Sequence, residues 1–90
     1  MVIKELMKLA EQGHAESQNS LGDVYCEGKG VPRDNTIAIE WYTKAAEQGH
    51  TEAQYTLGAF YEFGEGVGED CKEAGKWYTK AAEQLSLIHI

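Results

Sequence analysis

The sequence has few basic residues, one proline, two cysteines and no long apolar stretch, and these features exclude several classes of function. Eight Lys and Arg stand against fifteen Asp and Glu, for a net charge of −7. That balance disfavours nucleic acid and anionic membranes, because binding to either depends on cations that neutralise phosphate. No apolar run approaches the ~20 residues of a membrane-spanning helix. Residues 1–6 lack the basic head and apolar run of a signal peptide, so we expect a cytoplasmic chain, with a periplasmic or secreted parent left open.

Catalytic and metal-binding patterns are also missing. Cys26 and Cys71 occupy non-equivalent positions, which favours two thiols in a reducing compartment over a disulfide. The histidines, at 14, 50 and 89, form no Cys/His cluster with zinc spacing and do not lie close in sequence to either cysteine. We therefore expect no catalytic residue, no metal and no cofactor.

What the sequence has is an internal repeat. The octapeptide Trp41–Gln48 recurs letter for letter as Trp77–Gln84, and aligning residues 15–50 with 51–86 gives 18 identical pairs out of 36. A fixed offset of this size is typical of stacked supersecondary units. Apolar residues recur three and four positions apart and no strand pattern is present, so each unit is predicted to be a pair of helices. One more amphipathic helix is predicted over residues 2–12. The expected fold is all-α, with five helices.

The predicted helix ends carry recognisable signals. Gly13 and Gly49 follow glutamines at positions that suit a positive φ angle, and Gly28 can close its helix in the same way. Asp34 and Asp70 are placed to N-cap the helices that follow, with Glu73 completing a capping-box-like pair. The two glycine-rich loops between the helices lack the dinucleotide and Lys-Ser/Thr phosphate-loop patterns, so they are interpreted as turns, with Val31 and Val67 packed into the core.

Two features inside the helices recur in both units. Gly22 and Gly58 stand mid-helix, where glycine costs about 1 kcal/mol relative to alanine, so we predict close approach by another helix. Each Trp-Tyr pair alternates with alanines at helical spacing, which favours packing between antiparallel helices. An aromatic cage for a ligand stays open as the alternative for these pairs.

The first unit has the pattern Leu21-Gly22, Tyr25, Gly28, Gly30-Val31, Asp34, Ala38 and Trp41-Tyr42 through Gly49, and the second repeats it from Leu57 to Gln84, with Leu85 in place of the final glycine. This pattern closely resembles the Sel-1-like repeat, a relative of the tetratricopeptide repeats. The resemblance implies an α/α superhelix, a right-handed solenoid of antiparallel helix pairs that serves as a protein-binding scaffold, and it carries over no catalytic residue. On this basis residues 1–14 are the second helix of a truncated preceding repeat, 15–50 and 51–86 are two repeats, and 87–90 form a non-repeat tail. That apolar tail either caps the stack, leaves a sticky end or lies outside the natural sequence.

In this class of stack the first helix of each pair lines the concave side. Neither first helix contains Lys or Arg, so the expected groove is acidic and suits a basic or polar peptide segment. Helical spacing places the candidate partner-binding residues in this groove or at its rim: Glu16, Asn19, Asp23, Glu27, Glu52, Tyr55, Ala59 and Glu62.

Two other functions stay open at this point. Cysteine-rich relatives within the resembled family are associated with β-lactam binding or hydrolysis, but this sequence has neither their paired cysteines nor a Ser-x-x-Lys signature. The alternative is a purely structural chain that self-associates through apolar ends, with Val2, Ile3 and Leu6 at one end and the tail at the other.

Overall fold

Each predicted apolar stripe forms a helix in the computed structural model, which describes residues 3–64 and 68–88 and the side chains of these residues up to 85. The helices are α1 (Ile3–Glu11), α2 (Ala15–Glu27), α3 (Asn35–Glu47), α4 (Thr51–Phe63) and α5 (Cys71–Ile88). Over the described residues there is no strand. The predicted all-α fold with five helices is confirmed.

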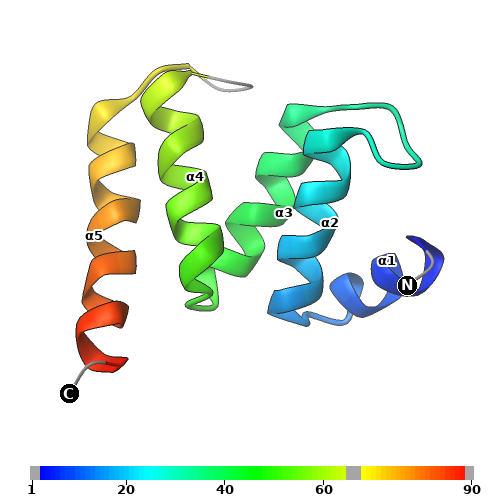
Figure 1. The fold of residues 1–90 in the computed structure, drawn as a ribbon, viewed down its shortest axis with the longest axis horizontal. Coiled ribbons are helices and arrows are strands. Elements are labelled where there is room, and N and C mark those ends of the chain that lie inside the picture. Colours follow the sequence, from blue (N-terminus) through cyan, green and yellow to red (C-terminus); the bar gives the residue numbers. More distant parts are fainter. Residues whose placement is uncertain (1–2, 65–67, 89–90) are drawn as a thin grey trace.

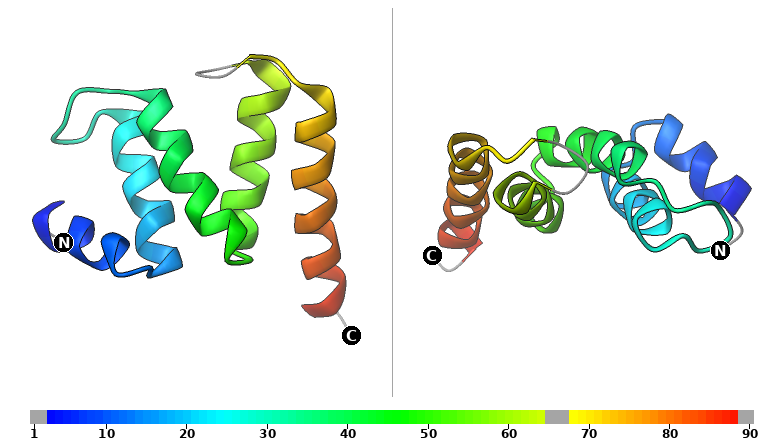
Figure 2. Two further views of the ribbon diagram at one scale, coloured as in Figure 1. Left: turned by 180° about the vertical axis from the view of Figure 1, so that it is seen from behind. Right: turned by 90° about the horizontal axis from the view of Figure 1, so that it is seen from above.

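The helices stack in chain order, each packed mainly on its neighbours in sequence (Figure 1). The most extensive contacts join α2 to α3 and α4 to α5, which are the two predicted helix pairs, and α3 joins one pair to the next. The result is a layer of 36 × 31 × 16 Å. Seen from above, α2 and α4 lie on the same side of α3 (Figure 2). This arrangement brings the two helices without basic residues to one side of the stack.

The helix ends follow the sequence signals. Gly13 and Gly49 have φ angles of 93° and 92°, and Gly28 closes α2 in the left-handed conformation at 71°. The carboxylate of Asp34 accepts the backbone N–H groups of Thr36 and Ile37, so its predicted N-cap role is confirmed. His14 and His50 also cap helices, α2 and α4, although no capping role was predicted for them: their Nδ1 atoms accept the N–H groups of Ser17 and Ala53.

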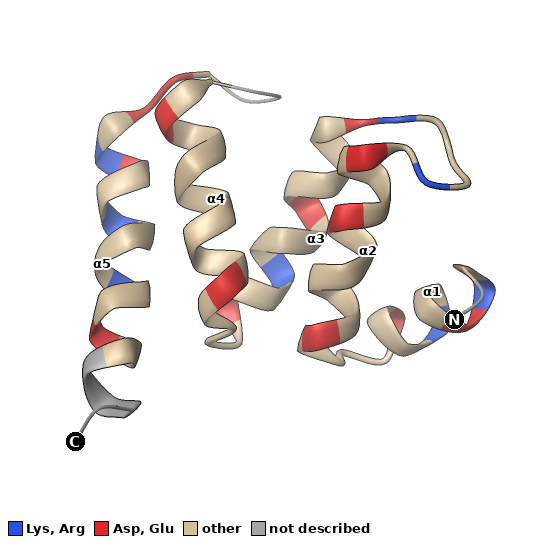
Figure 3. Cartoon of the chain, in the orientation of Figure 1, with Lys and Arg blue, Asp and Glu red and all other residues tan. Residues whose placement is uncertain are grey.

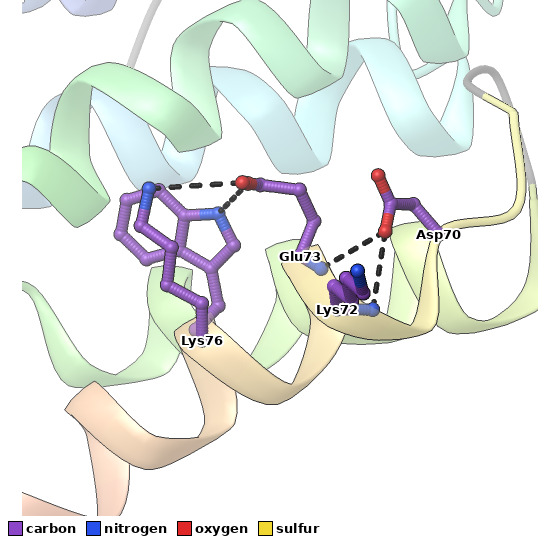
Figure 4. A network of polar contacts seen from close by, with 5 residues as sticks. Asp70, Lys72, Glu73 and Lys76 are labelled. Atoms are coloured by element: carbon purple, nitrogen blue, oxygen red, sulfur yellow. Dashed lines mark hydrogen bonds and ion pairs between the residues drawn. The ribbon is translucent and has the colours of Figure 1, made fainter.

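At the start of α5 only one of the two interactions of the predicted capping box is formed, the one made by Asp70. Asp70 accepts the N–H groups of Lys72 and Glu73, both at 3.1 Å. The Glu73 carboxylate turns along its own helix: it accepts the indole N–H of Trp77 at 3.2 Å and lies 3.7 Å from Lys76 Nζ (Figure 4). Asp70 therefore caps α5, and Glu73 ties the first turn of the helix to the second.

The core consists of two clusters of buried side chains. The larger one spans both helix pairs around Tyr42, Leu57 and Trp77, and the smaller one joins Leu6, Ala10 and Leu21. The repeated Trp-Tyr pairs are not equally buried. Phe60 of α4 covers Tyr42, with ring centroids 5.7 Å apart, whereas no described helix follows α5 to cover Tyr78, which is half-buried.

The last helix continues beyond the end of the repeat pattern. Leu85 stands where Gly49 ends α3, so the left-handed stop is absent and α5 extends to Ile88. Val67, which was predicted to pack into the core, and Val2, which was assigned to an apolar end, lie outside the described residues, as do the last two residues of the predicted tail. Within the described part of the chain, none of the helices is both long and apolar enough to cross a membrane.

Candidate partner-binding face on α2 and α4

Acidic residues gather on the two helices that open the repeats. We call Glu16, Asp23 and Glu27 of α2, with Glu52 and Glu62 of α4, the acidic face (Figure 3). No Lys or Arg lies on either helix. The nearest cation in sequence is Lys29, in the loop after α2.

On α2 the three carboxylates have different surroundings. Glu16 and Glu27 are exposed, and Glu27 lies 2.9 Å from Lys29 Nζ, whose pKa is raised by that hydrogen bond. Asp23 is half-buried and accepts a short hydrogen bond from the Tyr42 hydroxyl. Burial, and secondly this bond, raise the pKa of Tyr42 well above its usual value, because ionisation would place a second negative charge beside Asp23.

Asn19 differs from the other candidates because it is buried, at 5% exposure. Helical spacing placed it in the groove, but both α1 and α3 pack on α2 and widen the buried arc of that helix. Among the described residues its amide oxygen has no hydrogen-bond partner. Asn19 is thus part of the helix packing rather than of the exposed surface.

On α4 the candidate residues lie nearer the surface. Glu52 and Glu62 are exposed, Tyr55 is 43% exposed and Ala59 is half-buried. The Tyr78 hydroxyl donates to Glu62 at 2.8 Å, and the Tyr55 and Tyr78 ring centroids lie 6.0 Å apart. Burial, followed by the bond to Glu62, raises the pKa of Tyr78 as well.

The structure brings one candidate, Ala59, together with residues that the sequence did not single out. Ala59 lines a pocket of about 150 Å³ that opens between α2 and α4. Its other lining residues are Cys26, Thr56, Phe60 and Phe63. Phe63 is 69% exposed, which is unusual for so large an apolar side chain. The available signal was a difference between the repeats: Phe63 aligns with Glu27, and Ala59 with Asp23.

A second pocket, of about 370 Å³, opens between α1 and α2. Glu16 is its only lining residue among the candidates, and Leu6, Leu9, His14, Ser17 and Ser20 complete it.

The described residues contain no group of three or more His, Cys, Asp or Glu side chains that could hold a metal ion. Cys26 is half-buried on α2 and Cys71 is exposed at the start of α5, and no disulfide joins these two residues.

Two lysines make cation–π contacts with Trp77: Lys76 and Lys80 place Nζ 5.4 and 5.1 Å from its ring centroid.

Comparison with known proteins identifies the repeat. The Sel1 repeat model matches residues 15–50 and 51–84. A search of curated proteins finds no match.

Among solved structures, a Sel1 repeat protein from Oxalobacter formigenes is 46% identical, with a TM-score of 0.86, over 91% of this chain and 34% of that one. A protective antigen of uropathogenic Escherichia coli with an SLR fold is 43% identical, with a TM-score of 0.88, over 91% of this chain and 18% of that one. Helicobacter pylori cysteine rich protein B is 31% identical, with a TM-score of 0.86, over 89% and 60% of the two chains.

The chain thus spans only part of each of these solved proteins. Proteins with this repeat are helical scaffolds that typically mediate protein interactions. With matched repeats over most of its length and the same helical stack, the chain belongs to the Sel1 repeat family.

Proposed function

We propose that this chain is a non-catalytic interaction module that binds a basic segment of a partner protein through the acidic face. The observation that carries the proposal is the one-sided charge of α2 and α4, which hold five carboxylates and no Lys or Arg. Complementary charge speeds encounter and suppresses partners of the wrong sign. A partner anchored by its own carboxylates would find no cation on these two helices.

The two hydrogen bonds from tyrosines support this use of the face. Asp23 and Glu62 each accept a hydrogen bond from a tyrosine hydroxyl on the second helix of their own pair. The donors are Tyr42 for Asp23 and Tyr78 for Glu62. The bonds fix the direction of each carboxylate, while the second oxygen of the exposed Glu62 stays available to a cation. The Glu27–Lys29 pair is exposed on both sides, so a peptide cation can displace Lys29 at little expense.

The test is a titration with basic and acidic peptides of equal length at low and moderate salt. We expect the basic peptide to bind and its affinity to fall as salt screens the exposed charges. The binding variant is Glu16→Lys/Glu52→Lys, which reverses the charge at two exposed carboxylates of the acidic face. The matched control is Glu40→Lys/Glu47→Lys on the exposed surface of α3, since each pair changes the net charge from −7 to −3 (−7 + 4).

Loss of binding in the α2/α4 variant alone would support the acidic face as the docking site. Equal loss in both variants would mean that net charge, not this surface, attracts the peptide. A preference for the acidic peptide would refute the proposal.

A further inference from the structure

The two repeats differ most informatively at one place on the acidic face. Near the C-terminal ends of α2 and α4, Asp23 and Glu27 of the first repeat are replaced by Ala59 and Phe63 in the second. Both replacements exchange a carboxylate for an apolar group, and both residues line the 150 Å³ pocket. Packing in the core does not explain why position 63 is a phenylalanine, because the Phe63 side chain is 69% exposed.

The loss of Asp23's counterpart also redirects a hydrogen bond. In the first repeat, Tyr42 donates to Asp23. In the second, Ala59 offers no acceptor, and Tyr78 donates to Glu62, three positions further along α4. Ala59 therefore lines the pocket with Thr56 and Phe60 without a carboxylate at its own position.

The size of the pocket indicates what it can hold. Binding sites for small molecules and cofactors usually have volumes of ~300–1,000 Å³, about twice this volume or more. A pocket of about 150 Å³ with an exposed aromatic edge suits one apolar side chain of a longer ligand. The two helices that line the pocket, α2 and α4, carry the five carboxylates of the acidic face and no Lys or Arg.

We infer that this pocket seats a single large aliphatic side chain of a basic partner segment, flanked by Lys or Arg residues that pair with carboxylates of the acidic face. The inference rests on the proposed function and adds a sequence requirement to it. The acidic residues attract the segment and orient its cations, and the pocket selects a hydrophobic anchor between them. A few side chains seated in desolvated pockets commonly carry much of the affinity of an interface.

The experiment compares two basic peptides of equal length and charge, one with a central Leu between lysines and one with Ser in its place. We expect the Leu peptide to bind about tenfold more tightly, as partial burial of one leucine side chain predicts. Ala59→Asp and Phe63→Glu give the second repeat the residues of the first, and each should abolish the difference between the peptides while retaining affinity for both. Gln12→Glu, in the exposed turn after α1, is the control, because it adds the same negative charge as either variant and does not line the pocket.

A second measurement on the unaltered protein covers the case in which a variant unfolds: contacts by NMR between the leucine methyl groups and the Phe63 ring. If both peptides bind equally, the anchor inference is wrong and the acidic face remains supported. If neither binds, the proposed function fails and the inference fails with it. A Leu preference that survives both pocket variants, or methyl contacts elsewhere, would also overturn the inference.

Discussion

The ring of Tyr42 lies directly against the backbone of Gly22. A Cβ atom on Gly22 would be 2.7 Å from both Cδ1 and Cε1 of Tyr42, closer than real Cβ contacts allow. The ring has little freedom to retreat, because Phe60 packs on it and its hydroxyl donates to Asp23. The mid-helix glycine of the repeat therefore makes room for a tyrosine from the paired helix.

Substitution of Gly22 by alanine should destabilise the protein. Overpacking typically costs about 1–3 kcal/mol, and this outweighs the ~1 kcal/mol that alanine gains over glycine in a helix. Gly58→Ala should have a smaller effect, because the neighbouring Tyr78 ring is only half-buried and can move outward. Thermal unfolding of the two variants measures the difference, and a Gly22→Ala protein as stable as the parent would contradict the close packing.

Gly75 offers the opposite case in α5. It is exposed and helical, and a Cβ there would meet none of the described atoms within 4 Å. Gly75→Ala should therefore stabilise the protein by up to about 1 kcal/mol, which corresponds to a rise in Tm of roughly 4–8 °C for a domain of this size. An unchanged or lower Tm would show that α5 is not a continuous helix at this position.

The contrast between these glycines marks how far the sequence determines the structure. Recurrence of Gly22 and Gly58 was sufficient to predict close approach, and the glycine and aspartate signals placed the helix ends correctly. Burial of Asn19 could not be read from helical spacing, because it depends on α1 and α3 packing on α2 from two directions. The pocket at Phe63 was equally hidden, since a pattern search looks for agreement between repeats and this site arises where the repeats disagree.

Tyr42 should make the stability of the protein fall at alkaline pH. Its pKa is raised in the folded state, chiefly by burial and then by the bond to Asp23. The neutral hydroxyl thus contributes stability that is fully present below the unfolded-state pKa of ~10 and is lost as the pH rises above it, by up to about 1.4 kcal/mol per pH unit.

Melting of the parent and of Tyr42→Phe between pH 8 and 11 tests this expectation. At pH 8 the variant should be less stable by about 0.5–1.5 kcal/mol, because a hydrogen bond is lost. The gap should narrow and then reverse as the pH rises above about 10, since phenylalanine cannot ionise. Tyr78→Phe is the control, with a weaker effect expected at the more exposed Tyr78. Parallel pH profiles for the parent and Tyr42→Phe would rule out the role of Tyr42.

The glutamine near the end of each repeat, Gln48 or Gln84, has a different hydrogen-bond partner in the two repeats, and Thr51 accounts for the difference. There, Gln48 Nε2 donates to Gln18 Oε1 at 2.8 Å. In the second repeat the equivalent Gln84 instead accepts from Thr51 Oγ1 at 2.8 Å, where the first repeat has Ala15. Gln54 still donates to the Ala46 carbonyl, but its buried Oε1 atom has no hydrogen-bond partner among the described residues.

Thr51→Ala should therefore release Gln84 to donate to Gln54, as in the first repeat. Loss of the threonine bond costs about 1 kcal/mol, and satisfying a buried acceptor returns about 1–3 kcal/mol, so we expect unchanged or increased stability. Thr51→Ala/Gln84→Ala should be clearly less stable than Thr51→Ala, because the acceptor is again left without a donor. The side-chain amide signals of Gln54 and Gln84 in NMR spectra report the exchange of partners. A Thr51→Ala protein destabilised by 1 kcal/mol or more, with both amide signals unmoved, would mean that the second repeat cannot adopt the network of the first.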